Sequence, residues 1–345
     1  MTAPAYRVER ADPQLVQEAV VGLWRGNLGG GVDLYKKYRW LYGEEASQPG
    51  DIYLLYVSSQ DAPVGAYGLV PRNFRAADRI VRGAILSDLV VDSKHRTLFP
   101  GMLLQKTVVE DGGHRYELIY GFPNSNAKPL FRRLGYRPLG HMVRYTRLVD
   151  ATKKVKERLH PLLGAVISPV VNLALRMEIA LKTRQSKHRV AFSWNETGVN
   201  QWPLSTIRTA AVQGSRDAQF LHHRFARNPR GHFDLLGLLG NNNSVEGYAV
   251  VQTKLGVLSI VDLYVESQNL TATLLELIRE ARGRGAEAIH VELLDTPAVS
   301  NAVKAAGFLA REAREVYYFT ATDSPFRRML DDGIGWYLTA ADEDQ

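Results

Sequence analysis

The alternation of apolar and polar positions in the first 150 residues predicts a mixed α/β unit. Apolar residues at spacings of three and four indicate helices, and alternation with a period of two indicates strands. Helices and strands of this kind, interleaved along one chain, favour an α/β (α+β) class with helices packed on a sheet. The helices are expected at 13–24, 34–42, 101–111 and 127–134, and the strands at 6–9, 52–58, 63–70, 80–91, 118–120 and 142–148.

The second half of the chain repeats this order. Strands are expected at 233–239, 247–253, 258–265, 289–293 and 315–320, with helices at 271–282 and 300–306. Three matches recur at nearly one offset: Gly65 with Gly247, Asp88 with Asp262, and Leu134-Gly135-Tyr136 with Ala306-Gly307-Phe308. We interpret the two halves as a duplication. The alternative is two unrelated α/β domains that share the same order of strands and helices. The expected domains are 1–150 and 191–345, joined by a helical connector at 151–190.

Composition sets the class of protein. The chain has 345 residues, 45% hydrophobic and 23% charged, which is ordinary for two globular domains. It contains no cysteine, which excludes disulfides, thiolate zinc sites and a cysteine nucleophile. No segment has the pattern of a secretory signal or of a membrane-spanning helix. We therefore expect a cytoplasmic protein.

The positive charge is concentrated in the connector. The net charge is +7, and residues 151–190 contain nine Lys or Arg against Glu157 and Glu178, which equals the whole excess. Such a local charge argues against a nucleic-acid partner. The connector also has an apolar centre, 162–175, interrupted by Pro169. It could pack its apolar face between the domains, lie on an anionic membrane surface, or bind an anionic substrate.

The segment 88–101 carries the first candidate chemistry. A strand is followed by a loop and then by a helix, and helix N-terminal amides favour a phosphate group in front of them. Arg96, supported by Lys94, could add positive charge there. An ordinary turn with a solvated arginine is the alternative.

A second segment identifies a family. Residues 120–127, YGFPNSNA, end a strand and begin a helix with Asn124 available as a cap, and residues 130–136 read LFRRLGY. Together with the loop around Arg96, this pattern resembles the GNAT acetyltransferases over most of residues 5–150. In the family's pyrophosphate motif, Arg96 takes the first position and Gly101 the last. Phe99 replaces the middle glycine, which narrows the backbone approach to a pyrophosphate.

The resemblance implies an acetyl-CoA or other acyl-CoA cofactor bound in the first half. Pantetheine would pair with the backbone of a strand that separates from its neighbour. Phe131 stands where many family members carry a tyrosine that protonates the departing thiolate, so solvent or Tyr136 is expected to serve. The implied cofactor-binding residues are Leu89, Val90, Val91, Arg96, Thr97, Leu98, Phe99, Pro100, Gly101, Asn124 and Phe131.

Asp88 is the candidate general base, because an amine must lose a proton when it is acylated. The alternative is that Asp88 caps a turn or pairs with an arginine. In the second half, residues 266–270 offer neither arginine nor glycine, so this half is expected to be a scaffold or to shape the acceptor site. Asp262, Tyr264 and Glu292 could face that site. An aromatic cluster forms either an acceptor pocket or core: Trp24, Tyr35, Tyr38 and Trp40.

The function that the resemblance implies is direct acyl transfer from coenzyme A to a small amine in a ternary complex. Similar tandem proteins are associated with cell-envelope polysaccharides, which suggests an amino sugar. One alternative is an acyl-CoA sensor or scaffold without catalysis, favoured by Phe99 and Phe131. Another is an acyltransferase for lipid-linked precursors, which the basic connector would suit. The sequence makes no prediction about the oligomeric state.

Overall fold

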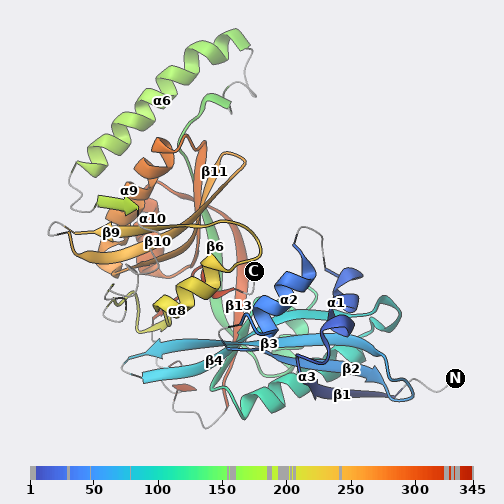
Figure 1. Cartoon of the computed structure of the whole chain (residues 1–345). Helices are drawn as coiled ribbons and strands as arrows, with labels where there is room; N and C mark the ends of the chain where they lie inside the picture. Colours follow the sequence, from blue (N-terminus) through green and yellow to red (C-terminus); the bar gives the residue numbers. More distant parts are fainter. Residues whose placement is uncertain are drawn as a thin grey trace.

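One large mixed sheet runs through the molecule (Figure 1). The computed structural model describes residues 5–28, 32–46, 48–77, 79–153, 155, 161–184, 189–192, 202, 204, 207–240, 243–321, 326–327, 330 and 335–343. The strands are β1 (Tyr6–Ala11), β2 (Asp51–Val57), β3 (Pro63–Ala76), β4 (Arg79–Val91), β5 (Leu118–Gly121), β6 (Arg137–Leu148), β7 (Arg189–Phe192), β8 (Val212–Gly214), β9 (Asp234–Leu239), β10 (Val245–Lys254), β11 (Val257–Val265), β12 (Ala288–Leu294), β13 (Leu309–Phe319) and β14 (Trp336–Tyr337).

The order along the sheet is β1-β2-β3-β4-β5-β13-β6-β12-β11-β10-β9-β7, while β8 pairs with β3 and β14 beside this path. Among the described strands, only β4–β5, β11–β12 and β8–β14 are parallel pairs. The expected mixed and mostly antiparallel sheet is therefore confirmed.

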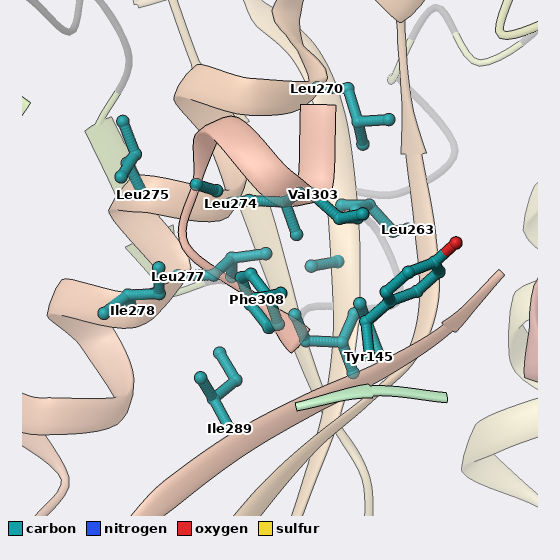
Figure 2. Close-up of a cluster of buried hydrophobic side chains, with 14 of the residues drawn as sticks. Tyr145, Leu263, Leu270, Leu274, Leu275, Leu277, Ile278, Ile289, Val303 and Phe308 are labelled. Carbon is teal, nitrogen blue, oxygen red and sulfur yellow. The ribbon is translucent and has the colours of Figure 1, made fainter. Parts of the chain in front are cut away.

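The helices cover both faces of the sheet. They are α1 (Gln17–Arg25), α2 (Leu34–Tyr42), α3 (Leu98–Gly113), α4 (Lys128–Arg133), α6 (Pro161–Thr183), α8 (Ala218–Leu221), α9 (Leu270–Gly283) and α10 (Pro297–Ala305). In the first half, α1 and α2 pack on one face, through Trp24 and Tyr38, and α3 packs on the other, through Leu104 and Val108. In the second half, α9 and α10 cover one face and enclose the cluster in Figure 2. The expected α/β class is confirmed, because each apolar face of the sheet is buried by amphipathic helices.

The closing strands of the two halves are exchanged. Strand β13 of the second half pairs with β5 of the first half, with Tyr317 opposite Gly121. Strand β6 of the first half lies between β13 and β12, with Tyr145 opposite Val291. The halves thus share a continuous sheet, and the division at residues 150 and 190 stays a prediction.

Three helix starts differ from the expected positions by three or four residues. Helix α10 begins at Pro297 instead of residue 300, since Thr296 caps it by accepting from the Val299 amide. Helix α1 begins at Gln17 instead of residue 13, because Asp12 forms a turn in which its carboxylate accepts from the Gln14 amide at 2.9 Å. Helix α3 begins at Leu98, three residues before the expected Gly101. The earlier start places Arg96 only two residues before the helix.

Helix α6 lies on the outside of the second half, along α9, and not between the two halves (Figure 1). Its inner side is fixed by buried Ile179 and by an ion pair of 3.0 Å between Glu178 and Arg147. In the described part of the chain, no helix combines the length and the apolar character needed to cross a bilayer. The basic residues Lys154, Lys156, Arg158 and Lys187 lie outside the described residues.

Candidate functional site

Strands β4 and β5 separate at the centre of the first half. Their ladder joins Gly83–Ile85 to Leu118–Tyr120 and then stops. From Leu86 to Val91, in the described structure, β4 has no ladder partner on this side. Strand β5 ends at Gly121, where the chain turns towards α4. The strands thus leave a gap in which backbone groups of β4 face the diverging edge.

A β-bulge lies within the separated part of β4. On the other side of the strand, Val90 pairs with Ala66 and Ser87 with Gly68, so Asp88 and Leu89 together oppose one residue. Asp88 has φ +56°, a left-handed conformation that is uncommon for residues other than glycine. Bulges and such conformations re-aim side chains and occur often next to functional sites.

Both carboxylate oxygens of Asp88 are engaged. Oδ1 lies 2.5 Å from Nζ of Lys37 on α2, and Oδ2 accepts a hydrogen bond of 2.9 Å from the Ser87 hydroxyl. The Asp88 and Lys37 side chains are both buried, and the ammonium lies 5.2 Å from the Trp24 ring centroid. The expected alternative was pairing with an arginine, and the observed partner is a lysine. The general-base role of Asp88 stays a prediction. In that role the carboxylate would have to accept a proton while it is also paired with Lys37.

Arg96 folds back towards the separated strand. Its Nε and Nη2 donate to the Val91 carbonyl at 3.3 and 3.2 Å, and Nη2 also donates to the Asn27 side chain. Nη1 donates no hydrogen bond within the described residues. The Val91 carbonyl, expected to face pantetheine, is therefore already bonded to the arginine. The guanidinium is exposed and keeps donors for an anion.

The N-terminus of α3 is open. The Thr97 side chain makes no capping hydrogen bond, and Leu98 and Phe99 are 64% and 53% exposed. The Phe99 ring centroid lies 6.2 Å from that of Tyr6, on β1. Pro100 has no amide hydrogen, so fewer donors are free than in an ordinary first turn. A Cβ at Gly101 would meet nothing within 4 Å, so the side of the first turn at Gly101 is uncovered.

Of the downstream motif residues, Asn124 caps a turn, whereas Phe131 and Tyr136 lie in the core. Asn124 Oδ1 accepts from the amides of Asn126 and Ala127 at 3.1 and 3.0 Å, so it holds the turn before α4. Phe131 and Tyr136 are both 3% exposed, with ring centroids 4.6 Å apart. Burial raises the pKa of Tyr136 well above 10. This core position does not favour Tyr136 as the acid that protonates a thiolate, because a buried hydroxyl of high pKa is a weak donor.

An open pocket of about 120 Å³ adjoins the point where the strands separate. Ile85 and Tyr120, the last ladder pair of β4 and β5, line it. Asp88 does not line it. Its walls come from both halves of the chain and from the C-terminal segment: Trp40, Leu41, Gln48, Val70, Pro71, Arg72, Asn73, Ser215, Asp217, Gln219, Phe220, His223, Arg224, Ala341, Asp342 and Glu343.

Trp40 and His223 join the two halves at this pocket. The Trp40 indole donates to the His223 carbonyl at 2.9 Å, and His223 Nε2 lies 2.9 Å from the Trp40 carbonyl. A carbonyl only accepts, so Nε2 carries the hydrogen and Nδ1 is the unprotonated nitrogen of the neutral ring. Burial lowers the pKa of His223, which favours that neutral form. Of the aromatic cluster, Trp40 lines the pocket, Trp24 and Tyr38 are core, and Tyr35 bonds to Glu18 and Arg25 near the surface.

A buried charge network holds the C-terminal segment behind the pocket. Arg216 pairs with Asp342 at 2.7 Å and with Asp262 at 3.0 Å, and Arg72 also binds Asp342. Burial alone raises the pKa of Asp342, but the Arg216 and Arg72 charges outweigh it and lower the pKa to about 2. Asp262, the counterpart of Asp88, is thus fully buried in this network and does not face a ligand.

The corresponding gap in the second half is closed by the chain itself. The ladder between β11 and β12 ends at Ile260 and Val291. The segment around β14 then occupies the gap: the Leu294 amide donates to the Leu338 carbonyl at 3.0 Å, and the Tyr337 hydroxyl donates to the Leu263 carbonyl at 2.7 Å. Thr339 bonds Asp262 at 2.7 Å. These contacts occupy the Leu263 carbonyl and the Leu294 amide, and a pocket of about 370 Å³ lined by Val265, Leu270 and Tyr337 lies beside them.

Sequence reasoning missed most of the pocket. Arg72 and Arg224 stand in no recognisable motif, and residues 215–224 come from a half that was expected to be a scaffold or to shape the acceptor site, without these residues being singled out. No local signal connects Trp40 to His223, since 183 positions separate them. Tyr264 is buried and donates to the Ile207 carbonyl, and Glu292 is held by Arg144 and Arg314.

Comparison with known proteins supports the fold through structure alone. No family model and no curated protein matches the sequence. A probable N-acyltransferase from Enterococcus faecalis is similar over 92% of this chain and 73% of that one, with a TM-score of 0.63 and 11% identity. A GCN5-related N-acetyltransferase from Kribbella flavida is similar over 92% of this chain and 71% of its own, with a TM-score of 0.58 and 13% identity. Another from Anabaena variabilis is similar over 91% of this chain and 72% of its own, with a TM-score of 0.61 and 10% identity.

These similarities extend over both halves, and they agree with the resemblance found in residues 5–150. At such low identity they establish architecture and not chemistry. The chain has the fold of the GCN5-related N-acetyltransferases.

Proposed function

We propose that the chain is an acyl-CoA-dependent N-acyltransferase that acylates a small amine and uses the first half for the cofactor. The separation of β4 from β5 beyond Ile85, next to an open helix N-terminus, is the observation that carries this proposal. A strand edge of this kind offers backbone hydrogen bonds to the amide groups of pantetheine. An unpaired strand edge suits an extended ligand and not a compact one.

The residues present fit this cofactor. Arg96 Nη1 has no hydrogen-bond partner among the described residues, the first turn of α3 has no side-chain cap, and nothing lies within 4 Å of a Cβ at Gly101. All three favour a phosphate group at the mouth of the gap. Phe99 is half exposed and rests against Tyr6, so it does not fill the gap. Bound acyl-CoA would supply an activated thioester at the inner end of the gap.

The pocket between the halves is the proposed acceptor site. It begins at Ile85 and Tyr120, where the gap ends, so an amine there would meet the acyl group. Trp40 and Phe220 provide aromatic walls, and Arg72, Asp217 and Gln219 provide polar ones. A ring with several hydroxyl groups, such as an amino sugar, matches this mixture of stacking and hydrogen-bonding surfaces. A fungal region described as a glucosamine N-acetyltransferase has the same fold, with a TM-score of 0.56 and 11% identity.

The reaction requires one proton acceptor and no covalent nucleophile. The amine nitrogen forms a bond to the carbonyl carbon, the bond to sulfur breaks, and the amine loses a proton. The candidates for that acceptor are His223, which lines the pocket, and Asp88 on the bulge, which does not line the pocket and would act through a water. Because Tyr136 is buried, water is the proposed donor to the thiolate.

Thiol release in the presence of a panel of amines tests the proposal. Acetyl-CoA is mixed with the protein and with glucosamine or other amino sugars, and free thiol is followed with a chromogenic disulfide. Glucose, which lacks the amine, is the matched control. Amine-dependent release supports the enzyme. Binding of acetyl-CoA without release from any amine would favour the alternative, a sensor, and the absence of binding would refute both.

A further inference from the structure

Helix α6 presents a continuous apolar stripe to the outside of the molecule. Its members are separated by three or four residues, which places them on one side of a helix. They are Ile167, Val170, Leu173, Met177 and Leu181, and they are 37%, 66%, 56%, 58% and 68% exposed. Single exposed apolar residues are ordinary, but an aligned set of this size marks an interaction surface.

The opposite side of α6 faces the rest of the molecule and is held there by several contacts. Ile179 and Ser168 are buried, and Glu178 pairs with Arg147 on β6. The Asn172 side chain donates to Asp150 and Thr152 at 3.2 and 2.9 Å. Figure 1 shows α6 at one end of the molecule, outside α9. A flat surface could therefore reach the stripe without first meeting the pocket.

Charge identifies what covers the stripe. Exposed Arg176 and Arg184 accompany it, and Lys182 is 37% exposed beside Glu178. The connector 151–190 contains the entire net charge of +7. A second copy of α6 against the stripe would bring like charges together, which is unfavourable. An anionic lipid surface would instead attract the basic residues and take up the apolar ones.

We propose that α6 lies in the plane of an anionic bilayer surface, with its stripe inserted among the headgroups. Amphipathic helices with an apolar side and basic flanks bind membranes in this way without crossing them. This inference is independent of acyl transfer, because it concerns a face of the molecule remote from the gap and pocket.

Sedimentation of the full chain with lipid vesicles tests the proposal. Vesicles of phosphatidylcholine alone are compared with vesicles that also contain phosphatidylglycerol, at about 0.05 M and about 0.5 M salt. The protein is expected to bind the anionic vesicles at low salt and to be released at high salt. Binding of neutral vesicles should be much weaker.

Two variants separate the contributions of the stripe and the charge. Replacing Val170, Leu173 and Leu181 with Gln should abolish binding, whereas Gln at exposed Ile80 and Leu255 should not change it. Replacing Arg176 and Arg184 with Gln should weaken partitioning about thirtyfold, at about fivefold per basic residue. Gln at Lys36 and Lys106 is the matched control for charge. All substituted positions are exposed, so unfolding temperatures should be unchanged.

Three results would overturn the proposal. One is the absence of binding to anionic vesicles at low salt. Another is equal binding to neutral vesicles, which would leave charge without a role. The third is a dimer, seen by light scattering without lipid, that the stripe variant converts to a monomer, since a second copy would then cover the helix.

Discussion

Reversal of the charge at Arg96 is the sharpest test of the cofactor site. A charge-assisted hydrogen bond contributes about 1.5–3 kcal/mol, and repulsion between an exposed carboxylate and a phosphate adds up to about 1 kcal/mol. The guanidinium is exposed, so the larger Coulomb energies of a buried site do not apply. Arg96→Glu should therefore weaken coenzyme A binding by about 2–4 kcal/mol, or about 30- to 1,000-fold.

Calorimetric titration with coenzyme A and acetyl-CoA measures this effect. Lys106→Glu is the matched control, because it makes the same charge change on α3 at a residue 57% exposed and away from the helix N-terminus. We expect it to change the affinity by less than about threefold, as a screened surface charge does. Thermal unfolding should be similar for both variants, since neither side chain is buried.

Two outcomes would refute the reasoning about Arg96. If Arg96→Glu binds as tightly as the unaltered chain, the loop does not hold a phosphate. If both variants lose affinity equally, the general field of the protein attracts the ligand and the loop has no special role.

Three further predictions follow from the site. Titration should give one coenzyme A per chain, because the segment around Leu338 closes the second gap, and two equivalent sites would contradict this. Asp88→Asn should lower turnover about a hundredfold or more with little change in cofactor affinity, whereas a comparable loss only in His223→Gln would assign the base to the pocket histidine. Asp342 has a pKa of about 2 in the folded protein against an ordinary 3.8. Its ionised carboxylate therefore adds to the free energy of unfolding above about pH 4, and this stabilisation is lost as the pH falls towards 2. That contribution is roughly 2 kcal/mol, and Asp342→Asn should flatten the dependence of the unfolding free energy on pH between about 4 and 2. An unchanged slope would show that other groups control it.

Local patterns predicted the strands and helices well because they depend on neighbours along the chain. Helix α2 begins after Asp33, whose carboxylate accepts from the amides of Tyr35 and Lys36, and it spans the expected 34–42. Strands β3 and β4 extend beyond the expected ends and form a long hairpin. The start of α3 was misplaced because glycine at residue 101 resembles a break, although it lies inside the helix.

The candidate site was predictable only in part. The turn of Asn124 and the loop of Arg96 are local features, so their residue types are informative. The lysine beside Asp88 was not predicted, because Lys37 is 51 positions away and looks like any basic residue on an amphipathic helix. Tyr136 and Phe131 were assigned by resemblance, and the packing of α4 places both in the core.

The sequence by itself determined the repeated order of elements, the mixed sheet and the location of the positive charge. It also determined the difference between the loop around Arg96 and the loop at residues 266–270. All of these follow from residue types at short spacing. Only the tertiary structure decided that β6 and β13 exchange places, since backbone hydrogen bonds in a ladder do not distinguish one apolar strand from another. It also decided that residues 336–339 close the second gap, and that Trp40 and His223 complete a pocket at the end of the first. Contacts between distant segments depend on the packing of whole surfaces, which no short stretch of sequence encodes.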